Sequence, residues 1–150
     1  MIPITVFDCM ILLQAAANPL GEAGRCYLAV EMGLVQLTVS QATRYEAYDV
    51  LSRGLIRLKL PNLTAERVAE FMDSVDYYAL QIVAVPLTFR IPRDPKDEKY
   101  LNLAIAAGAQ YLVSRDNDLL DLMQDSRFRT NYPNLEILGP AEFLDRVARI

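Results

Sequence analysis

Short apolar, β-branched runs alternate along this chain with longer segments of helical periodicity. The runs predict strands at residues 3–7, 35–39, 80–85, 111–114 and 135–138. Apolar positions that recur every three or four residues predict helices at residues 10–17, 22–33, 41–51, 65–79, 95–107 and 140–147. Because strands and helices alternate, we expect one three-layer α/β/α domain with a mainly parallel sheet of about five strands.

Capping signals support several of these boundaries. Ser40 and Thr64 are suitable N-cap residues for the helices that follow them. Asp94-Pro95 combines an N-cap with proline at the first helical position, and Gly108 is suited to end that helix. Residues 54–60 show no clear pattern before Pro61, so we predict an irregular segment there.

The composition is that of a globular protein. The chain has 150 residues, 53% hydrophobic and 23% charged, which permits a sizeable core and excludes a disordered chain. We expect one domain over residues 1–150. No apolar stretch has the length of a membrane helix, and Asp8 interrupts the apolar N-terminus where a secretion signal would need an unbroken run. We therefore expect a cytoplasmic protein without a membrane segment.

The absence of histidine narrows the possible chemistry. The chain contains no His and two Cys, in no metal-binding or disulfide spacing, which excludes His-dependent triads and zinc sites. Hydrolytic chemistry must then depend on carboxylates, lysine, hydroxyls or a carboxylate-bound metal. The formal net charge of −4 gives no overall attraction to nucleic acid, although only three of the 15 basic residues are Lys and Arg is well suited to phosphate.

Acidic residues occur where a parallel sheet places its ligand sites. Asp8 and Asp116 follow two predicted strands, Asp97 lies in the first turn of a helix, and Glu46 lies within the helix over residues 41–51. If these four carboxylates converge, their repulsion requires protonation or a bridging cation. Ligands that offer only oxygen select hard cations such as Mg²⁺ or Mn²⁺, which are suited to phosphodiester hydrolysis.

Four segments together resemble a PIN domain, in particular the VapC-like toxin components. They are Val6-Phe7-Asp8, the helix containing Glu46, the run Arg93–Leu101 containing Asp97, and the run Tyr111–Leu120 containing Asp116. Each segment is weak alone, but their order and spacing are specific, and the resemblance extends from about residue 4 to residue 144.

The resemblance implies a Mg²⁺- or Mn²⁺-dependent endoribonuclease that hydrolyses RNA with an activated water. The family's acids fall on Asp8, Glu46, Asp97 and Asp116, with Asp118 as a substitute for the last, and its supporting hydroxyl falls on Ser114. It further implies a homodimer and, for a toxin, an inhibitory antitoxin that occupies the active-site groove.

The sequence departs from the family pattern directly after Asp8. Family members usually have Thr or Ser and then Asn there, whereas this chain has Cys9 and Met10. Methionine cannot donate the hydrogen bonds that asparagine makes to acids and water, and such losses cost about 10- to 100-fold in affinity or activity. The departure predicts a weakened nuclease, an altered metal preference or an inactive protein.

Each acid, taken alone, also has a simpler structural explanation. Asp8 is a suitable helix N-cap, Asp97 favours a helix dipole, and Asp116 or Asp118 can cap the short helix through residues 119–122. Glu46 is equally compatible with a solvated helix face. The occurrence of all four in family order favours the metal site.

Four basic residues near the proposed groove are candidates for binding RNA phosphates, namely Arg44, Arg93, Lys99 and Arg115. Arg44 and Lys99 are explained equally well by pairing with acids on neighbouring helices.

Two other function classes compete with the nuclease. Met10 favours a catalytically degenerate PIN domain that binds RNA or a protein partner. An aspartyl-phosphate enzyme or receiver also has an acid after its first strand, but the phosphatase would need a second acid at position 10, where Met10 stands.

Overall fold

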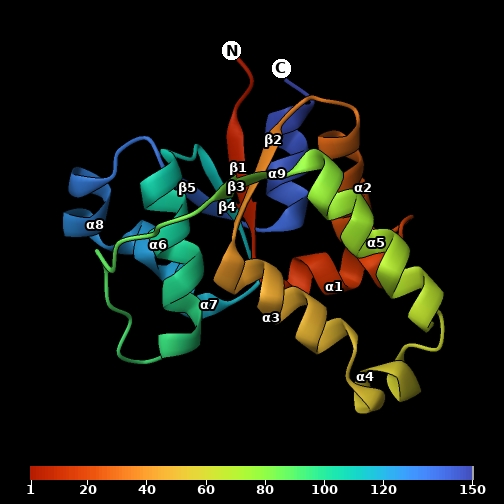
Figure 1. The fold of residues 1–150 in the computed structure, drawn as a ribbon. Helices are drawn as coiled ribbons and strands as arrows, with labels where there is room; N and C mark the ends of the chain where they lie inside the picture. Colours follow the sequence, from red (N-terminus) through yellow and green to blue (C-terminus); the bar gives the residue numbers. More distant parts are fainter. Residues whose placement is uncertain (150) are drawn as a thin grey trace.

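A central sheet of five parallel strands organises residues 1–149, which a computed structural model describes (Figure 1). The strands are β1 (Ile4–Phe7), β2 (Gln36–Ser40), β3 (Leu80–Ile82), β4 (Tyr111–Val113) and β5 (Glu136–Leu138). Their order is β3-β2-β1-β4-β5, and every neighbouring pair is parallel. The predicted α/β/α fold with a parallel sheet is confirmed.

Helices connect consecutive strands and cover both faces of the sheet. They are α1 (Cys9–Ala17), α2 (Glu22–Glu31), α3 (Gln41–Leu51), α4 (Gly54–Lys59), α5 (Ala65–Tyr78), α6 (Glu98–Ala107), α7 (Asn117–Leu120), α8 (Ser126–Asn131) and α9 (Pro140–Val147), with 3₁₀ turns η1 (Pro95–Asp97) and η2 (Asp121–Gln124). Over residues 1–149, no helix has both the length and the apolar character needed to cross a membrane.

Alternating side chains divide the core into two layers. Phe7, Val113 and Leu138 pack with α1, α2, α3, α5 and α9 on one face of the sheet. Their neighbours Val6 and Leu112 pack with α6, α7 and α8 on the other face. Because successive strand residues point to opposite faces, each central strand is apolar on both sides. Figure 1 shows α6 and α8 on one side of the sheet and α2, α5 and α9 on the other.

The carboxyl ends of the central strands lie at one edge of the molecule, where α1, α3 and α7 begin (Figure 1). The N-cap of each helix is the polar residue that ends or follows the strand. Asp8 accepts a hydrogen bond from the Ile11 N–H at 3.0 Å, and Asp116 accepts one from the Asp118 N–H at 2.8 Å. Because β1 and β4 are neighbours, these two capping acids are brought to the same edge.

Two predictions, for residues 80–85 and for residues 54–60, differ from the structure. The strand predicted over residues 80–85 is confined to β3 (Leu80–Ile82). Its partner β2 ends at Ser40, which pairs with Ile82, so β3 has no strand to pair with beyond Ile82, and Val83 is 91% exposed. The irregular segment predicted over 54–60 is wrong, since α4 forms there with Ile56 packed against the core. This tertiary contact stabilises a helix that the local pattern does not predict.

The helix predicted over 95–107 begins one turn later than expected. Residues 95–97 form the 3₁₀ turn η1, and α6 follows and ends at Gly108 in a left-handed conformation, φ 64°. The short helix predicted through residues 119–122 is divided between α7 and η2, and α8 was not predicted. The early turn orients Asp97, its last residue, toward the edge where the strands end.

We predict that Gly24→Ala destabilises the fold. A methyl group on this α2 residue would lie 2.2 Å from the backbone carbonyl oxygen of Pro19, and backbone atoms cannot move as a flexible side chain does. Overpacking of this kind costs about 1–3 kcal/mol in the free energy of unfolding. Urea denaturation of the two proteins measures the difference.

Gly54→Ala is the matched control. A methyl group at Gly54, the first residue of α4, meets no atom within 4 Å. We expect unchanged or slightly increased stability, because alanine favours the helix. Equal effects of the two substitutions would contradict the close packing at Gly24.

Candidate metal centre

Four aspartates from two chain segments converge at the carboxyl edge of the sheet. Asp94 precedes η1 and Asp97 is its last residue, whereas Asp116 and Asp118 lie at the junction of β4 and α7. Each contributes one carboxylate oxygen to a group whose members all lie within 4.8 Å of one another. We call these four residues the aspartate cluster.

The local turns explain why these side chains point together. Asp94 accepts a hydrogen bond from the Lys96 N–H at 3.2 Å, which starts η1 and places Asp97 one turn later. Asp116 caps α7 in the same way and thereby fixes the position of Asp118. Two Asx-type caps therefore bring two pairs of carboxylates to one point.

Asp97 is the most buried member of the aspartate cluster. The residue is only 9% exposed, and the buried Oδ2 of its side chain has no hydrogen-bond partner among the described residues. Burial first, then the hydrogen bond and charge of Asp116, raise the pKa of Asp97 to about 8. The charges of Asp94 and Asp8 act in the same direction. In the absence of a cation, the fold therefore keeps the Asp97 carboxyl group protonated at neutral pH.

Ser114 links Asp8 to the aspartate cluster. Its hydroxyl donates to Asp8 Oδ2 at 2.5 Å, and its Oγ accepts from the Asp116 N–H at 2.9 Å. Burial raises the pKa of Asp8, although the bonds from Ser114 and the Ile11 N–H oppose this effect. The structure thus places the first predicted acid beside the last one, with the predicted hydroxyl between them.

Glu46 lies outside the aspartate cluster and is held by two donors from α6. Lys99 Nζ lies 2.5 Å from Glu46 Oε2, and the Tyr100 hydroxyl donates to Oε1. Both carboxylate oxygens of Glu46 are therefore engaged by the protein. Of the predicted acids, the structure groups Asp97, Asp116 and Asp118 most closely, with Asp8 linked to them through Ser114 and Glu46 paired with Lys99 outside the cluster.

The donor set fits a hard divalent cation. The aspartate cluster offers only oxygen, which suits Mg²⁺ or Mn²⁺. The thiol of Cys9 is not a member of this group, and burial raises its pKa to about 11, which keeps it protonated at neutral pH in the metal-free protein. The buried, unpartnered oxygen of Asp97 lacks the positive or donor group that a carboxylate in this environment requires. A cation would supply it.

The predicted RNA-binding cations are all paired with carboxylates in the structure. Arg44 makes two hydrogen bonds to Asp76 of α5, at 2.5 and 2.8 Å, on the β3 side of the molecule. Arg115 lies 3.4 Å from Glu22, and Lys99 is bound to Glu46. Arg93, with its side chain 64% exposed, lies 2.7 Å from Asp118. Of the four, Arg93 and Lys99 directly contact acids of the predicted site.

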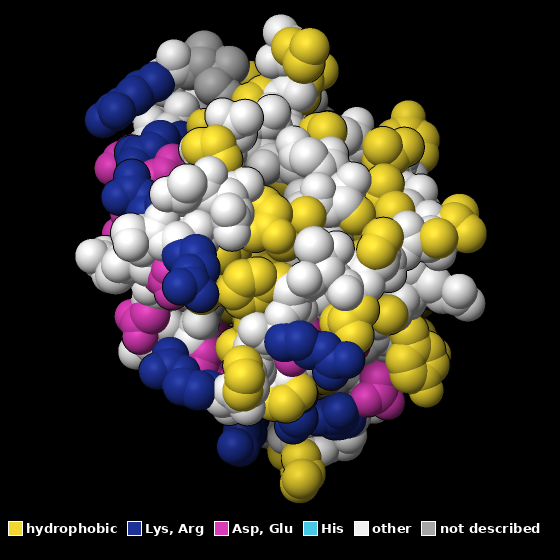
Figure 2. Space-filling view, turned by 90° about the vertical axis from the view of Figure 1, so that its left-hand side faces the viewer, with side chains coloured by type: hydrophobic (Ala, Val, Ile, Leu, Met, Phe, Trp, Pro, Cys, Tyr) yellow, Lys and Arg dark blue, Asp and Glu magenta, His cyan; other side chains and the backbone are white. Residues whose placement is uncertain are grey.

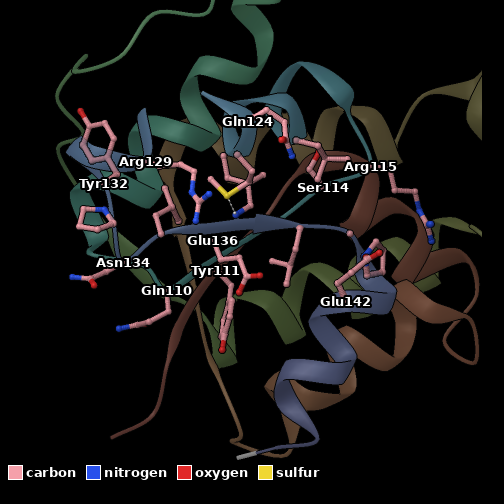
Figure 3. A pocket seen from close by; sticks show the side chains of 18 of the residues that line it. Gln110, Tyr111, Ser114, Arg115, Gln124, Arg129, Tyr132, Asn134, Glu136 and Glu142 are labelled. Carbon is pink, nitrogen blue, oxygen red and sulfur yellow. Dashed lines mark hydrogen bonds between the residues drawn. The ribbon is translucent and has the colours of Figure 1, made fainter. Parts of the chain in front are cut away.

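A large groove lies along the edge strand β5, and no member of the aspartate cluster lines it. It has a volume of about 1290 Å³, and its lining includes Arg129, Glu136 and Glu142. Figure 3 shows its labelled polar side chains spread from one end of β5 to the other, without a point where they meet. Among the described residues, the acids that lie close enough together to hold a metal ion belong to the aspartate cluster and not to this groove, so the chemistry is better assigned to the cluster.

The sequence profile of the PIN domain family matches residues 5–118 of this chain. The chain belongs to the PIN domain family. PIN domains are generally metal-dependent nucleases. The chain is also similar to the uncharacterized protein MJ1680 of Methanocaldococcus jannaschii, with 26% identity over 143 residues that cover 93% of this chain and 88% of the relative.

Sequence reasoning missed one member of this PIN domain's aspartate cluster. Asp94 was assigned only the N-cap role, which its side chain does perform. The spacing Asp94-x-x-Asp97 carries the missing signal, because residues three apart in a helical turn project from the same side. Asp94 therefore joins the predicted acids as a candidate ligand.

Asp97→Asn is predicted to stabilise the metal-free protein at alkaline pH. The pKa of Asp97 is about 8 in the folded state against an ordinary 3.8, so the folded state binds more protons between these values and loses stability as pH rises through them. The variant avoids this loss. We expect its advantage in unfolding free energy to exceed about 1.4 kcal/mol, the equivalent of one pKa unit, near pH 8 and to vanish near pH 4.

Urea unfolding with a chelator present, at several pH values, checks this expectation. Asp145→Asn, at an exposed position of α9, is the control and should show no such pH-dependent gain. An Asp97→Asn protein less stable than the wild type at pH 8 would show that Asp97 is ionised without strain in the free protein.

Proposed function

We propose that this PIN domain is a Mg²⁺- or Mn²⁺-dependent endoribonuclease. The observation that carries the proposal is the buried, unpartnered Oδ2 of Asp97 inside the aspartate cluster. Such an oxygen is costly to bury as an anion, and a divalent cation removes the cost. Membership of the PIN domain family, whose members are generally metal-dependent nucleases, supports the same chemistry.

The residues divide the work by position. Asp94, Asp97, Asp116 and Asp118 would hold the cation, because their oxygens are mutually closest. Asp8 adds a further carboxylate beside them, held in place by Ser114. A bound divalent cation supplies Lewis acidity, which favours the nucleophilic form of water and stabilises charge that develops on the phosphodiester. Glu46, which the family resemblance predicts as an acid of the site, forms an ion pair with Lys99.

RNA is the proposed substrate, and Arg93 is the strongest candidate for a phosphate contact. Its exposed guanidinium already lies on Asp118, so a small movement would exchange a carboxylate for a phosphate of RNA. Figure 2 shows Lys and Arg side chains in separate groups beside Asp and Glu on the face it presents, without a continuous basic surface. Binding is therefore expected to depend on the cation and a few arginines.

We further propose, from the family resemblance, a cytoplasmic toxin of a toxin-antitoxin pair that forms a homodimer. Exposed tyrosines on α3 and α5, among them Tyr45, Tyr48 and Tyr77, support a subunit interface on that side. An antitoxin would be encoded beside this reading frame, and co-expression would relieve any toxicity of the chain expressed alone.

We predict that Mn²⁺ raises the melting temperature of the wild type and that Asp97→Asn abolishes this shift. A ligand at 100 times its dissociation constant stabilises the native state by about 2.7 kcal/mol, which thermal unfolding readily detects. The same substitution should lower Mn²⁺-dependent cleavage of RNA by more than about 100-fold, since even indirect support of a metal is worth 10- to 100-fold.

Asp145→Asn should retain both the shift and the cleavage, because it removes an exposed acid of α9 that is not a member of the cluster. A wild type that binds Mn²⁺ but cleaves none of several RNAs would reject the nuclease and leave a metal-binding PIN domain. An unchanged melting temperature with both Mg²⁺ and Mn²⁺ would reject the metal site itself.

A catalytically degenerate PIN domain that binds RNA or a protein is the second candidate. It is favoured by Met10, an apolar residue that is 50% exposed and follows Asp8 by two positions. If Met10 limits an active nuclease, Met10→Asn should raise cleavage by about 10- to 100-fold through a restored hydrogen-bonding side chain. Rates of RNA cleavage by the two proteins test this, and failure of both to cleave would favour the binding module.

A further inference from the structure

Glu46 is already neutralised by the protein itself. Lys99 Nζ lies 2.5 Å from its Oε2, and the Tyr100 hydroxyl occupies its Oε1. The side chains of Lys99 and Glu46 are only 31% and 26% exposed, so this pair is shielded from solvent more than a typical surface ion pair. A cation at Glu46 would have to displace both donors.

The two donors are fixed by the start of α6. Tyr100 is buried in the core, and burial together with its bond to Glu46 raises the pKa of its hydroxyl, which keeps it a donor. Lys99 Nζ lies 5.8 Å from the centroid of the Tyr100 ring, which favours the ammonium in this position. Lys99 also follows Asp97 by two residues, so the start of α6 carries both an acid of the aspartate cluster and this ammonium group.

The ammonium stands close to where a second ion would bind. Mg²⁺ binds carboxylate oxygen at about 2.0–2.1 Å. Lys99 Nζ lies 2.5 Å from Glu46 Oε2, only slightly farther. The charges of Glu46, Asp8 and Lys99 all act on the Cys9 thiol, so the ammonium is in the neighbourhood of Asp8. A divalent ion brought beside it would be repelled and would lose Glu46 as a ligand. The aspartate cluster, by contrast, contains the unpartnered oxygen of Asp97.

We infer that Lys99 takes the place of a second divalent cation, so that this PIN domain binds one ion, at the aspartate cluster. The inference rests on the proposed metal site and specifies its stoichiometry. In this arrangement Glu46 is a positioning residue that holds the ammonium, and it is not a ligand. Lys99 supplies a permanent positive charge at Glu46, and the aspartate cluster holds one exchangeable cation.

Counting Mn²⁺ ions bound to the full, chelator-treated chain by electron paramagnetic resonance tests the inference without any RNA. The wild type should bind one Mn²⁺ per chain and show the spectrum of isolated ions. Lys99→Met removes the charge but keeps the length, and it should bind a second ion whose spin couples to the first. Lys99→Arg should restore the single isolated ion.

Lys59→Met is the matched control, because Lys59 is an exposed lysine on α4. It should leave one ion bound. Glu46→Gln provides a second test that does not depend on the folding of Lys99→Met, and it should keep one Mn²⁺ at unchanged affinity. Circular dichroism establishes that each variant is folded.

The outcomes separate this inference from the proposed function. Two ions on the wild type, a single ion on folded Lys99→Met, or lost Mn²⁺ binding in Glu46→Gln would each overturn the role of Lys99 and leave the metal site intact. A wild type that binds no Mn²⁺ would overturn the metal site and, with it, the role of Lys99.

Discussion

Repulsion between carboxylates crowded at one edge of the sheet is the constraint on which the site depends. Asp8 and the aspartate cluster lie there, Glu46 lies in α3 beyond the end of β2, and the protein moderates the charge of these acids in different ways. Ser114 donates to Asp8, and Lys99 and Tyr100 donate to Glu46. Arg93 lies against Asp118. Of the buried acids, Asp97 keeps one oxygen without a hydrogen-bond donor among the described residues. Its raised pKa reflects the unfavourable free energy of a negative charge at this position.

The parallel sheet creates this crowding, and the same feature makes it useful. Parallel strands direct all their carboxyl ends to one edge, and each helix that starts there needs an N-cap. Aspartate is a favourable cap, so Asp8 and Asp116 serve the fold while they bring negative charge to the site. Structural and functional explanations of these residues are therefore compatible. Because the ionised Asp97 carboxylate is unfavourable in the free protein, a bound cation would stabilise it.

Much of the fold followed from local pattern. Each central strand is buried on both faces, so its apolar runs are unmistakable, and the caps at Ser40, Thr64 and Asp94 lie where the sequence predicts them. The errors lie at margins. The β3 edge and α4 depend on one-sided contacts with the rest of the molecule, which periodicity cannot report. The positions of Asp8 and Asp116 were predictable, because an aspartate that follows a parallel strand lies at the edge of the sheet where the strands end.

The sequence by itself determined the parallel α/β/α architecture, the exclusion of histidine chemistry and the acids from which a site could be built. Only the tertiary structure decided which of them meet. In the tertiary structure Asp94 lies with Asp97, Asp116 and Asp118, whereas Glu46 binds Lys99 and Tyr100. The physical reason is range. Burial patterns and caps are set by neighbours within a few residues, whereas a carboxylate finds its partner across packed helices 53 or 54 positions away in the chain.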